Sequence, residues 1–239
     1  MIRYSDIYTG KFIDRPNRFI AHVEINGNVE TVHVKNTGRC RELLIPGVNV
    51  SVQHFDKPGR KTKWDLIGVE KANLGWINID SQVPNKVVGE WLKEENQEFK
   101  NVTFIKPEYK YGNSRVDFYI EDGDRKILLE VKGCTLEVDG KGYFPDAPTE
   151  RGSKHLMELA SAINEGYEAY LVYCIAMNGI KEVFPNETTD PKYAESLKRA
   201  VAAGVKVINL QCNVDKDSIE WKEERIYSDL NIPYVRVVF

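Results

Sequence analysis

Short hydrophobic segments separated by turn residues fill the first eighty positions of the chain. Four of them have the length and composition of strands, and they span residues 18–24, 29–34, 48–55 and 63–69. Val32 and Val34 alternate with polar neighbours, as in a half-buried strand, and Asn26-Gly27 before them is a strong hairpin signal. Several short strands in one compact unit predict a small all-β barrel, of which the OB type is one candidate.

After Pro84-Asn85 the pattern changes to helices that alternate with strands. Apolar residues have helical spacing over 87–99, 153–164 and 191–203, and strand-like segments occupy 103–131, 169–176 and 205–210. Gly166 and Gly204 follow two of the helical segments, at the position where a glycine commonly ends a helix. The alternation predicts an α/β domain with a mixed sheet and helices packed on its faces.

The change of pattern near residues 81–85 indicates a domain boundary. We therefore expect a nucleic-acid-binding barrel over residues 1–82 and a mixed α/β domain over residues 83–239. The chain finishes with an apolar, strand-like segment, residues 232–239. This segment either completes the core or pairs with a second copy in a homodimer, and the sequence leaves both alternatives open.

Composition favours a cytoplasmic protein that folds without cross-links. The chain has 239 residues, and its 42% hydrophobic content is enough to fill a core. Its four cysteines are scattered, with no CxxC pair, so neither a zinc site nor a disulfide framework is indicated. No segment approaches the ~20 apolar residues of a membrane helix, and the first residues are too polar for a secretory signal.

Charge is distributed unevenly along the sequence. The net charge is −3, which argues against a general polycation. Residues 1–80 nevertheless hold 12 Lys and Arg against 9 Asp and Glu, and residues 81–239 hold 21 against 27. This asymmetry favours a first half that faces nucleic acid and a second half that faces a metal, although ordinary surface scatter explains the numbers equally well.

The candidate chemistry lies in two strand-like segments, residues 114–118 and 127–132, joined by a charged turn at Gly123. Glu130 and Lys132 are two positions apart and share a face of their strand, and a hairpin at Gly123 would bring Asp117 close to them. Two carboxylates suit Mg²⁺ or Mn²⁺, and a lysine beside the ion could position a water molecule for attack on a phosphate. Such a group is suited to phosphodiester hydrolysis.

Other interpretations exist for each of these residues. An isolated Asp or Glu-x-Lys on a strand is usually a solvated edge. Glu90, on the helix before the strands, is a candidate third acidic catalytic and metal-binding residue, and equally a surface residue. The helix that follows residue 149 offers Arg151 and Lys154 to an anion at its N-terminus. His155 there has no visible metal-binding partner and is equally a surface histidine.

Basic and aromatic residues of the first half are candidates for contact with DNA. Together with Arg115, Arg151 and Lys154 of the second half, the candidates are Arg18, Lys35, Asn36, Arg39, Arg41, Arg60, Lys61, Lys63 and Trp64. The run at 56–64 is equally a solvated hairpin tip, and Asn36 is equally a residue that a tight turn requires. None of these side chains forms a base-specific code, so we expect contacts to the DNA backbone and little dependence on base sequence.

Several segments in order along the chain resemble the sugar fermentation stimulation protein family. The segments are RFIAHV (18–23), HVKNTGRCRELL (33–44), YGNSRVDF (111–118), LEVKGCTL (129–136), FPDAPTERGSKHLMEL (144–159) and DPKYAESLKRAVAAGV (190–205). The resemblance implies an N-terminal OB-type domain followed by a PD-(D/E)xK, restriction-endonuclease-like domain. It also implies DNA binding, with Asp117, Glu130 and Lys132 as the acidic site and Glu90 as an addition. The chain departs from the family pattern beside the site, at Gly133-Cys134 and Pro148.

Two functional hypotheses follow. The first is a metal-dependent DNA endonuclease or exonuclease that uses Mg²⁺ or Mn²⁺ at Asp117, Glu130 and Glu90. The alternative is a non-catalytic DNA-binding regulator of sugar (maltose) metabolism genes that retains the nuclease fold. A sugar or nucleotide enzyme is disfavoured, because the sequence has no phosphate-cradling glycine loop.

Overall fold

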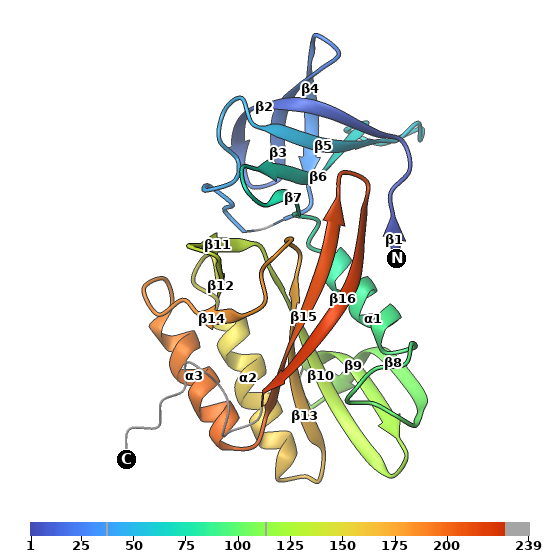
Figure 1. The fold of residues 1–239 in the computed structure, drawn as a ribbon, viewed down its shortest axis with the longest axis vertical. Coiled ribbons are helices and arrows are strands. Elements are labelled where there is room, and N and C mark those ends of the chain that lie inside the picture. The colour runs from blue at the N-terminus through green and yellow to red at the C-terminus, as the bar shows by residue number, and fades with distance from the viewer. Residues whose placement is uncertain (37, 113, 228–239) are drawn as a thin grey trace.

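The computed structural model describes residues 1–36, 38–112 and 114–227, so the apolar segment at 232–239 lies outside the described residues. Within these ranges, none of the helices is both long enough and apolar enough to cross a membrane. The four cysteines are free and buried. Figure 1 shows two units along the longest axis, a barrel formed by the first strands and a larger unit that contains all three labelled helices.

The first unit is a closed barrel of five strands. Its strands are β2 (Ile7–Asn17), β3 (Ile20–Ile25), β4 (Asn28–Val34), β5 (Asn49–His54) and β6 (Trp64–Lys71). They are hydrogen-bonded in the order β4-β3-β2-β5-β6, and the parallel pairing of β4 with β6 closes the barrel. The short β7 (Gly75–Asn78) adds to β6. The predicted hairpin is confirmed, since Asn26 and Gly27 between β3 and β4 both have the positive φ that a type I′ turn needs.

The second unit is built on a seven-stranded mixed sheet in the order β1-β16-β15-β13-β10-β9-β8. The strands are β1 (Ile2–Arg3), β8 (Val102–Tyr111), β9 (Ser114–Asp122), β10 (Arg125–Cys134), β13 (Glu168–Ile175), β15 (Lys206–Asp215) and β16 (Ser218–Tyr227). The central β10, β13 and β15 run parallel, and the flanking strands are antiparallel. The mixed sheet predicted from the sequence is therefore confirmed. The first strand, β1, precedes the barrel in the sequence but belongs to this sheet, where it pairs with β16.

Within the described residues, three helices cover the two faces of this sheet. In Figure 1, α2 (Glu150–Ile163) and α3 (Pro191–Ala202) lie together on one face, and α1 (Val83–Trp91) lies on the other. Their buried side chains belong to two separate hydrophobic clusters, one on each side of the sheet. A small sheet of β11 (Leu136–Val138), β12 (Lys141–Phe144) and β14 (Val183–Pro185) lies beside the N-terminal end of α2.

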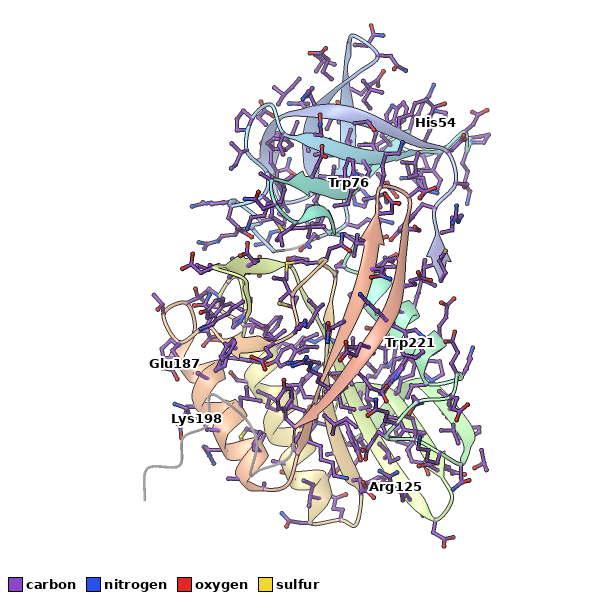
Figure 2. The ribbon with its side chains drawn as sticks, viewed as in Figure 1. His54, Trp76, Arg125, Glu187, Lys198 and Trp221 are labelled. Carbon is purple, nitrogen blue, oxygen red and sulfur yellow. The ribbon has the colours of Figure 1, made fainter. Side chains whose placement is uncertain are left out.

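The hairpin of β9 and β10 is fixed at its turn by Arg125. The Arg125 guanidinium donates to Asp122 at 2.7 Å and to Glu168 of the neighbouring β13 at 2.8 Å. Figure 2 shows Arg125 at the end of the sheet that is remote from the barrel. The other end of the same hairpin therefore points toward the barrel, and this end carries the predicted site.

Polar contacts join the barrel to the second unit. The backbone amide of Arg39, which follows β4 of the barrel, donates to Asp146 Oδ2 of the second unit at 3.1 Å. Trp76 of β7 lies near the tip of the β15–β16 hairpin in Figure 2, and Asn78 of β7 donates its amide to the Ala176 carbonyl at 3.0 Å. These contacts hold the two units against each other.

Candidate functional site

The register of β9 and β10 brings the two predicted carboxylates to the same level of the sheet. The last hydrogen-bonded pair of the ladder is Phe118 with Leu129, and one step further along the strands Asp117 faces Glu130. At this step the ladder opens, because Asp117 Oδ2 accepts the amide proton of Val131 at 2.7 Å. The structure therefore brings Asp117, Glu130 and Lys132 together, as the hairpin interpretation requires.

Glu130 is held as a carboxylate by two donors. Its side chain is buried, and Oε1 accepts from Lys132 Nζ at 2.7 Å and forms a short hydrogen bond with His155 Nδ1. Burial alone would raise the pKa of Glu130, but the hydrogen bonds from His155 and Lys132 outweigh it and hold the pKa below its ordinary value. The second oxygen, Oε2, is buried and has no hydrogen-bond partner among the described residues.

Asp117 has the opposite electrostatic balance. Burial and the nearby charge of Glu130 raise its pKa above the ordinary value. Hydrogen bonds from the Val131 amide and from Asn85 Nδ2, the latter at 2.8 Å to Oδ1, oppose this shift without cancelling it. Two neighbouring carboxylates in such an environment repel each other, and a cation between them would relieve the repulsion.

Two side chains of this group were not identified from the sequence. Asn85 lies in the first turn of α1, directly after Pro84, and its only signal is this position at a helix start. His155 was expected to be equally well explained as a surface residue, but it is 6% exposed and bonded to Glu130. Arg151 Nε donates to His155 Nε2 at 3.3 Å, so the proton of a neutral His155 ring is on Nδ1, facing Glu130.

Glu90 does not join the site, and its assignment as a catalytic and metal-binding residue is wrong. Its Oε2 accepts from the amino group of Met1 at 2.7 Å, and the side chain does not line the cavity described below. The buried face of α1 is formed by residues such as Val87, Val88 and Trp91. Glu90 lies off this face, because successive residues of a helix are rotated by about 100° about its axis. Its carboxylate instead pairs with the Met1 amino group, next to the edge strand β1.

The site opens into a cavity of about 670 Å³ between the barrel and the second unit. Its walls come from the barrel loop at Asn36 and Gly38, the connection 78–85, the β9–β10 hairpin and the start of α2. The ionisable lining residues are Asp80, Glu108, Asp117, Glu130, Lys132, Asp146 and Arg151. Five of these seven are acidic, so a phosphate would not enter without cations to offset the charge.

The donor set fits a hard divalent cation. The buried, unpartnered Oε2 of Glu130 is an oxygen that lacks a ligand, and Asp117 retains lone pairs beyond the two that accept hydrogen bonds. In the described part of the chain, no three His, Cys, Asp or Glu side chains are grouped closely enough to hold a metal ion. Magnesium commonly takes only one or two carboxylates and keeps several of its waters, so this sparse set is suited to it.

Two residues predicted to contact DNA have structural roles in the barrel. Lys35 donates to Asp80 Oδ2 at 2.6 Å, and its side chain is only 15% exposed. The Arg60 guanidinium is paired with the buried Asp65 and lies over the ring of Phe55 at 4.0 Å. We therefore correct their assignment, because both cations neutralise or cover buried groups instead of facing solvent.

The other predicted contact residues lie in three places. On the barrel, the side chains of Arg18, Arg39, Arg41, Lys61 and Lys63 are exposed, and Trp64 is half-buried. The Trp64 ring packs at 5.2 Å from Tyr8 and at 4.6 Å from His54, which Figure 2 shows on the barrel. Asn36 and Arg151 line the cavity, whereas Arg115 is exposed on β9 and Lys154 faces Glu158 at 3.6 Å.

The fold and the site together define a class of protein: a closed OB-type barrel followed by a mixed α/β domain with two carboxylates and a lysine on adjacent strands. A family model described as "SfsA N-terminal OB domain" matches residues 13–79. A second, described as "Sugar fermentation stimulation protein RE domain", matches residues 82–218. The chain belongs to the sugar fermentation stimulation protein family, and its second domain has the restriction-endonuclease-like, PD-(D/E)xK fold that the resemblance implied.

Relatives cover nearly the whole chain. A sugar fermentation stimulation protein homolog of Desulfitobacterium hafniense is 56% identical, over 92% of this chain and 95% of its own. A homolog of Clostridium beijerinckii is 54% identical over 93% of this chain and 97% of its own. A solved structure of Pyrococcus furiosus SfsA in complex with Ca²⁺ is 30% identical, with a TM-score of 0.82 over 93% of this chain and 96% of that chain.

Proposed function

We propose that this protein is a metal-dependent phosphodiesterase that acts on DNA at the cavity between its two domains. One observation carries the proposal: Oε2 of Glu130 is buried without a partner among the described residues, and Glu130 and the half-buried Asp117 both line a cavity large enough for a small ligand. An unsatisfied carboxylate oxygen in such a place is costly unless a cation occupies the site.

A divalent cation with oxygen ligands is the implied cofactor, and we propose Mg²⁺ or Mn²⁺. The related Pyrococcus furiosus protein was solved in complex with Ca²⁺, another hard divalent cation. When bound at Asp117 and Glu130, the ion would offset the charge that develops on a phosphate and would lower the pKa of a water molecule.

The protein side chains around this position have separate tasks. Lys132 lines the cavity and donates one hydrogen bond to Glu130, so its other N–H groups can orient a water molecule toward a phosphate. His155 fixes Glu130 through Oε1, and Oε2, which has no partner among the described residues, would be the oxygen that binds the cation. Arg151 uses Nε for His155, and the other nitrogens of its guanidinium are available to a phosphate oxygen.

We propose that the exposed cations of the barrel bind the DNA backbone. Arg39 and Arg41 follow the loop that lines the cavity, and Lys61 and Lys63 precede the half-buried Trp64. Basic residues combined with aromatic rings are the usual means by which small barrels bind nucleic acid. Binding of this kind contacts phosphates and does not depend strongly on base sequence.

Cleavage of a plasmid in the presence of Mg²⁺ or Mn²⁺ tests the proposal. We expect cutting that depends on the metal and is lost, by at least about a hundredfold, in Asp117→Asn and in Lys132→Met, with DNA binding retained. Glu90→Gln is the matched control, because it removes a carboxylate from the preceding helix but not from the cavity, and it should cut at the wild-type rate. Cleavage by Asp117→Asn at the wild-type rate would contradict the proposal.

The second candidate is a DNA-binding regulator without catalytic turnover. The curated relatives are named for stimulation of sugar fermentation, which is an effect that control of sugar metabolism genes would produce. Tight duplex binding with no cleavage under any divalent ion would favour this candidate over the nuclease.

A further inference from the structure

An apolar strip leads from the small sheet into the cavity. Residues 144–148, Phe-Pro-Asp-Ala-Pro, all belong to the cavity wall, and four of the five side chains are apolar. The charged one, Asp146, accepts a hydrogen bond from the Arg39 amide of the barrel at 3.1 Å. The strip therefore gives the cavity, whose charged lining is mostly acidic, one apolar wall.

Phe144 is the aromatic residue of this strip. Its ring packs against two buried tyrosines, at 5.7 Å from Tyr173 and at 5.1 Å from Tyr193. The hydroxyl groups of these tyrosines are hydrogen-bonded to each other at 2.7 Å. Phe144 itself is only half-buried, and the rest of its side chain belongs to the cavity wall. A partly exposed ring that buried rings hold in one orientation is pre-organised to stack on a flat ligand.

The register of the sheet places this ring next to Lys132. Tyr173, on which Phe144 packs, is the β13 partner of Lys132 on β10. The side chains of two such partners project from the same face of the sheet, and adjacent strands are about 4.8 Å apart. The aromatic wall and the proposed cation site are therefore neighbouring parts of one cavity.

The carboxylates of the site are recessed. Glu130 is 3% exposed and Asp117 is half-buried, at a cavity that lies between the two domains. In a duplex the bases are paired and stacked in the interior, and the phosphates follow a regular outer path. A phosphate reaches recessed carboxylates only when its nucleotide leaves that path, as in enzymes that extrude a nucleotide or act on single strands.

We propose that the cavity takes an unpaired nucleotide, whose base stacks on Phe144 while its phosphate lies at Lys132. This inference rests on the proposed function and names its substrate class, which is DNA in a single-stranded region. The cavity of about 670 Å³ is within the range of pockets that enclose a small molecule. Stacking on an aromatic ring tolerates any base, so the pocket needs no base-specific contact.

Two DNA substrates of the same sequence, one fully paired and one with a single-stranded gap, test the substrate class by their cleavage in Mn²⁺. We expect the wild type to cut the gapped substrate at least about tenfold faster, because a paired nucleotide must first be unstacked. Phe144→Leu keeps an apolar side chain against the tyrosines but has no ring, and it should lower kcat/KM on the gapped substrate by about tenfold. Phe144→Tyr keeps the ring and should retain the wild-type value.

A third substrate, with a gap whose nucleotides lack their bases, separates stacking from a structural role of Phe144. Removal of the bases should lower kcat/KM of the wild type by about tenfold and should have no further effect on Phe144→Leu. Phe104→Ala is the matched control. It removes a phenylalanine that is 46% exposed on the edge strand β8 and does not line the cavity, so it should respond to all three substrates as the wild type does.

Equal cleavage of paired and gapped DNA by the wild type would overturn the inference and leave the proposed function standing. The same holds if base removal has its full effect in Phe144→Leu. Fluorescence anisotropy measures binding of the gapped and base-free substrates in Ca²⁺, the cation of the related Pyrococcus furiosus structure. Binding that depends on the bases and on Phe144, with no cleavage in Mg²⁺ or Mn²⁺, would support the nucleotide pocket and overturn the proposed function.

Discussion

Asp117 and Glu130 face each other across two strands, but their surroundings shift their pKa values in opposite directions. Glu130 has two charged or polar donors, His155 and Lys132, that stabilise its ionised form. The hydrogen bonds that Asp117 accepts come from neutral groups, the Val131 amide and Asn85, and burial and repulsion by Glu130 outweigh them and the attraction of Lys132. In the absence of a cation, the ionised Asp117 therefore destabilises the fold.

We predict that Asp117→Asn stabilises the metal-free protein at neutral pH by on the order of 1 kcal/mol. Because the pKa of Asp117 is raised on folding, the cost of its ionisation is fully present above the raised pKa and absent below the ordinary value of 3.8. The advantage of the variant should therefore shrink as the pH falls toward that value. Urea unfolding in EDTA at several pH values measures it.

The control for this prediction is Asp124→Asn, at the exposed turn of the same hairpin. It should change the free energy of unfolding by less than about 0.5 kcal/mol at any pH. A stability gain for Asp117→Asn that is unchanged at low pH would show that the effect does not come from ionisation.

At the residue scale, the sequence predicts side chains that are close along one hairpin and fails for those that meet across the fold. Asp117, Glu130 and Lys132 could be grouped because strand alternation and a turn at Gly123 are local features. His155 contacts Glu130 from 25 positions away, and no local pattern reveals that contact. Glu90 was wrongly included because its sequence position does not say which side of α1 faces the sheet.

At the scale of elements, the strands with strong apolar alternation were predicted and those without it were not. The long strand β2 buries only Gly10 and Phe12, so it has little hydrophobic signal despite eleven residues in the sheet. The helix α1 was expected over 87–99, but it begins at Val83, with Pro84 in its first turn, and ends at Trp91. The strand segments at 103–131 and 169–176 were confirmed as β8, β9, β10 and β13.

The start of α2 is the element on which the site depends most. Thr149 caps the helix, with its hydroxyl accepting the Gly152 amide at 3.0 Å, and its own amide donates to Asp190 at 2.7 Å. Arg151 lines the cavity from the first turn, and His155 reaches Glu130 from the next. The position of both side chains follows from where this helix begins.

We predict that Thr149→Ala lowers the free energy of unfolding by about 1 kcal/mol, the usual cost of removing an N-cap. Thr149→Ser keeps the hydroxyl and should retain most of that stability. Thermal or urea unfolding of the three proteins measures the difference. An equal loss in Thr149→Ser would show that packing of the threonine methyl group, and not the cap, stabilises this end of the helix.

At the scale of the whole molecule, buried charge joins the barrel to the cavity. Lys35 at the end of β4 contacts Asp80 at 2.6 Å and Asp65 at 3.8 Å, and both carboxylates are almost fully buried. Asp80 lies in the connection between the domains and forms part of the cavity wall. The two-domain arrangement could be predicted from the change of pattern near residue 81, but the ion pair that ties the barrel to this connection could not, because Lys35 and Asp80 are 45 positions apart.

The division between structural and exposed cations leads to one prediction with two arms. Lys35→Met leaves the buried Asp80 without its cation and should lower the free energy of unfolding by about 3 kcal/mol. Lys61→Ala and Lys63→Ala alter exposed side chains and should change the free energy of unfolding by less than about 0.5 kcal/mol.

DNA affinity should depend on the exposed lysines and not on Lys35. Each exposed lysine that contacts a phosphate should, when removed, reduce the slope of log affinity against log salt concentration by about 1.

Lys35→Met, measured where it is fully folded, should keep the wild-type salt slope. Lys35 is paired with Asp80 and contacts no DNA phosphate, so it displaces no counterions from the DNA. Fluorescence anisotropy with a short duplex at several salt concentrations, alongside urea unfolding, separates the two effects. A reduced slope in Lys35→Met with unchanged stability would contradict the ion pair with Asp80 and restore this lysine to the DNA-binding surface. If the slope stayed at the wild-type value in both exposed-lysine variants, the nucleic acid would have to bind elsewhere. The next cations to test would be the exposed Arg39 and Arg41, which follow the cavity-lining Gly38, and Arg151 of the cavity wall.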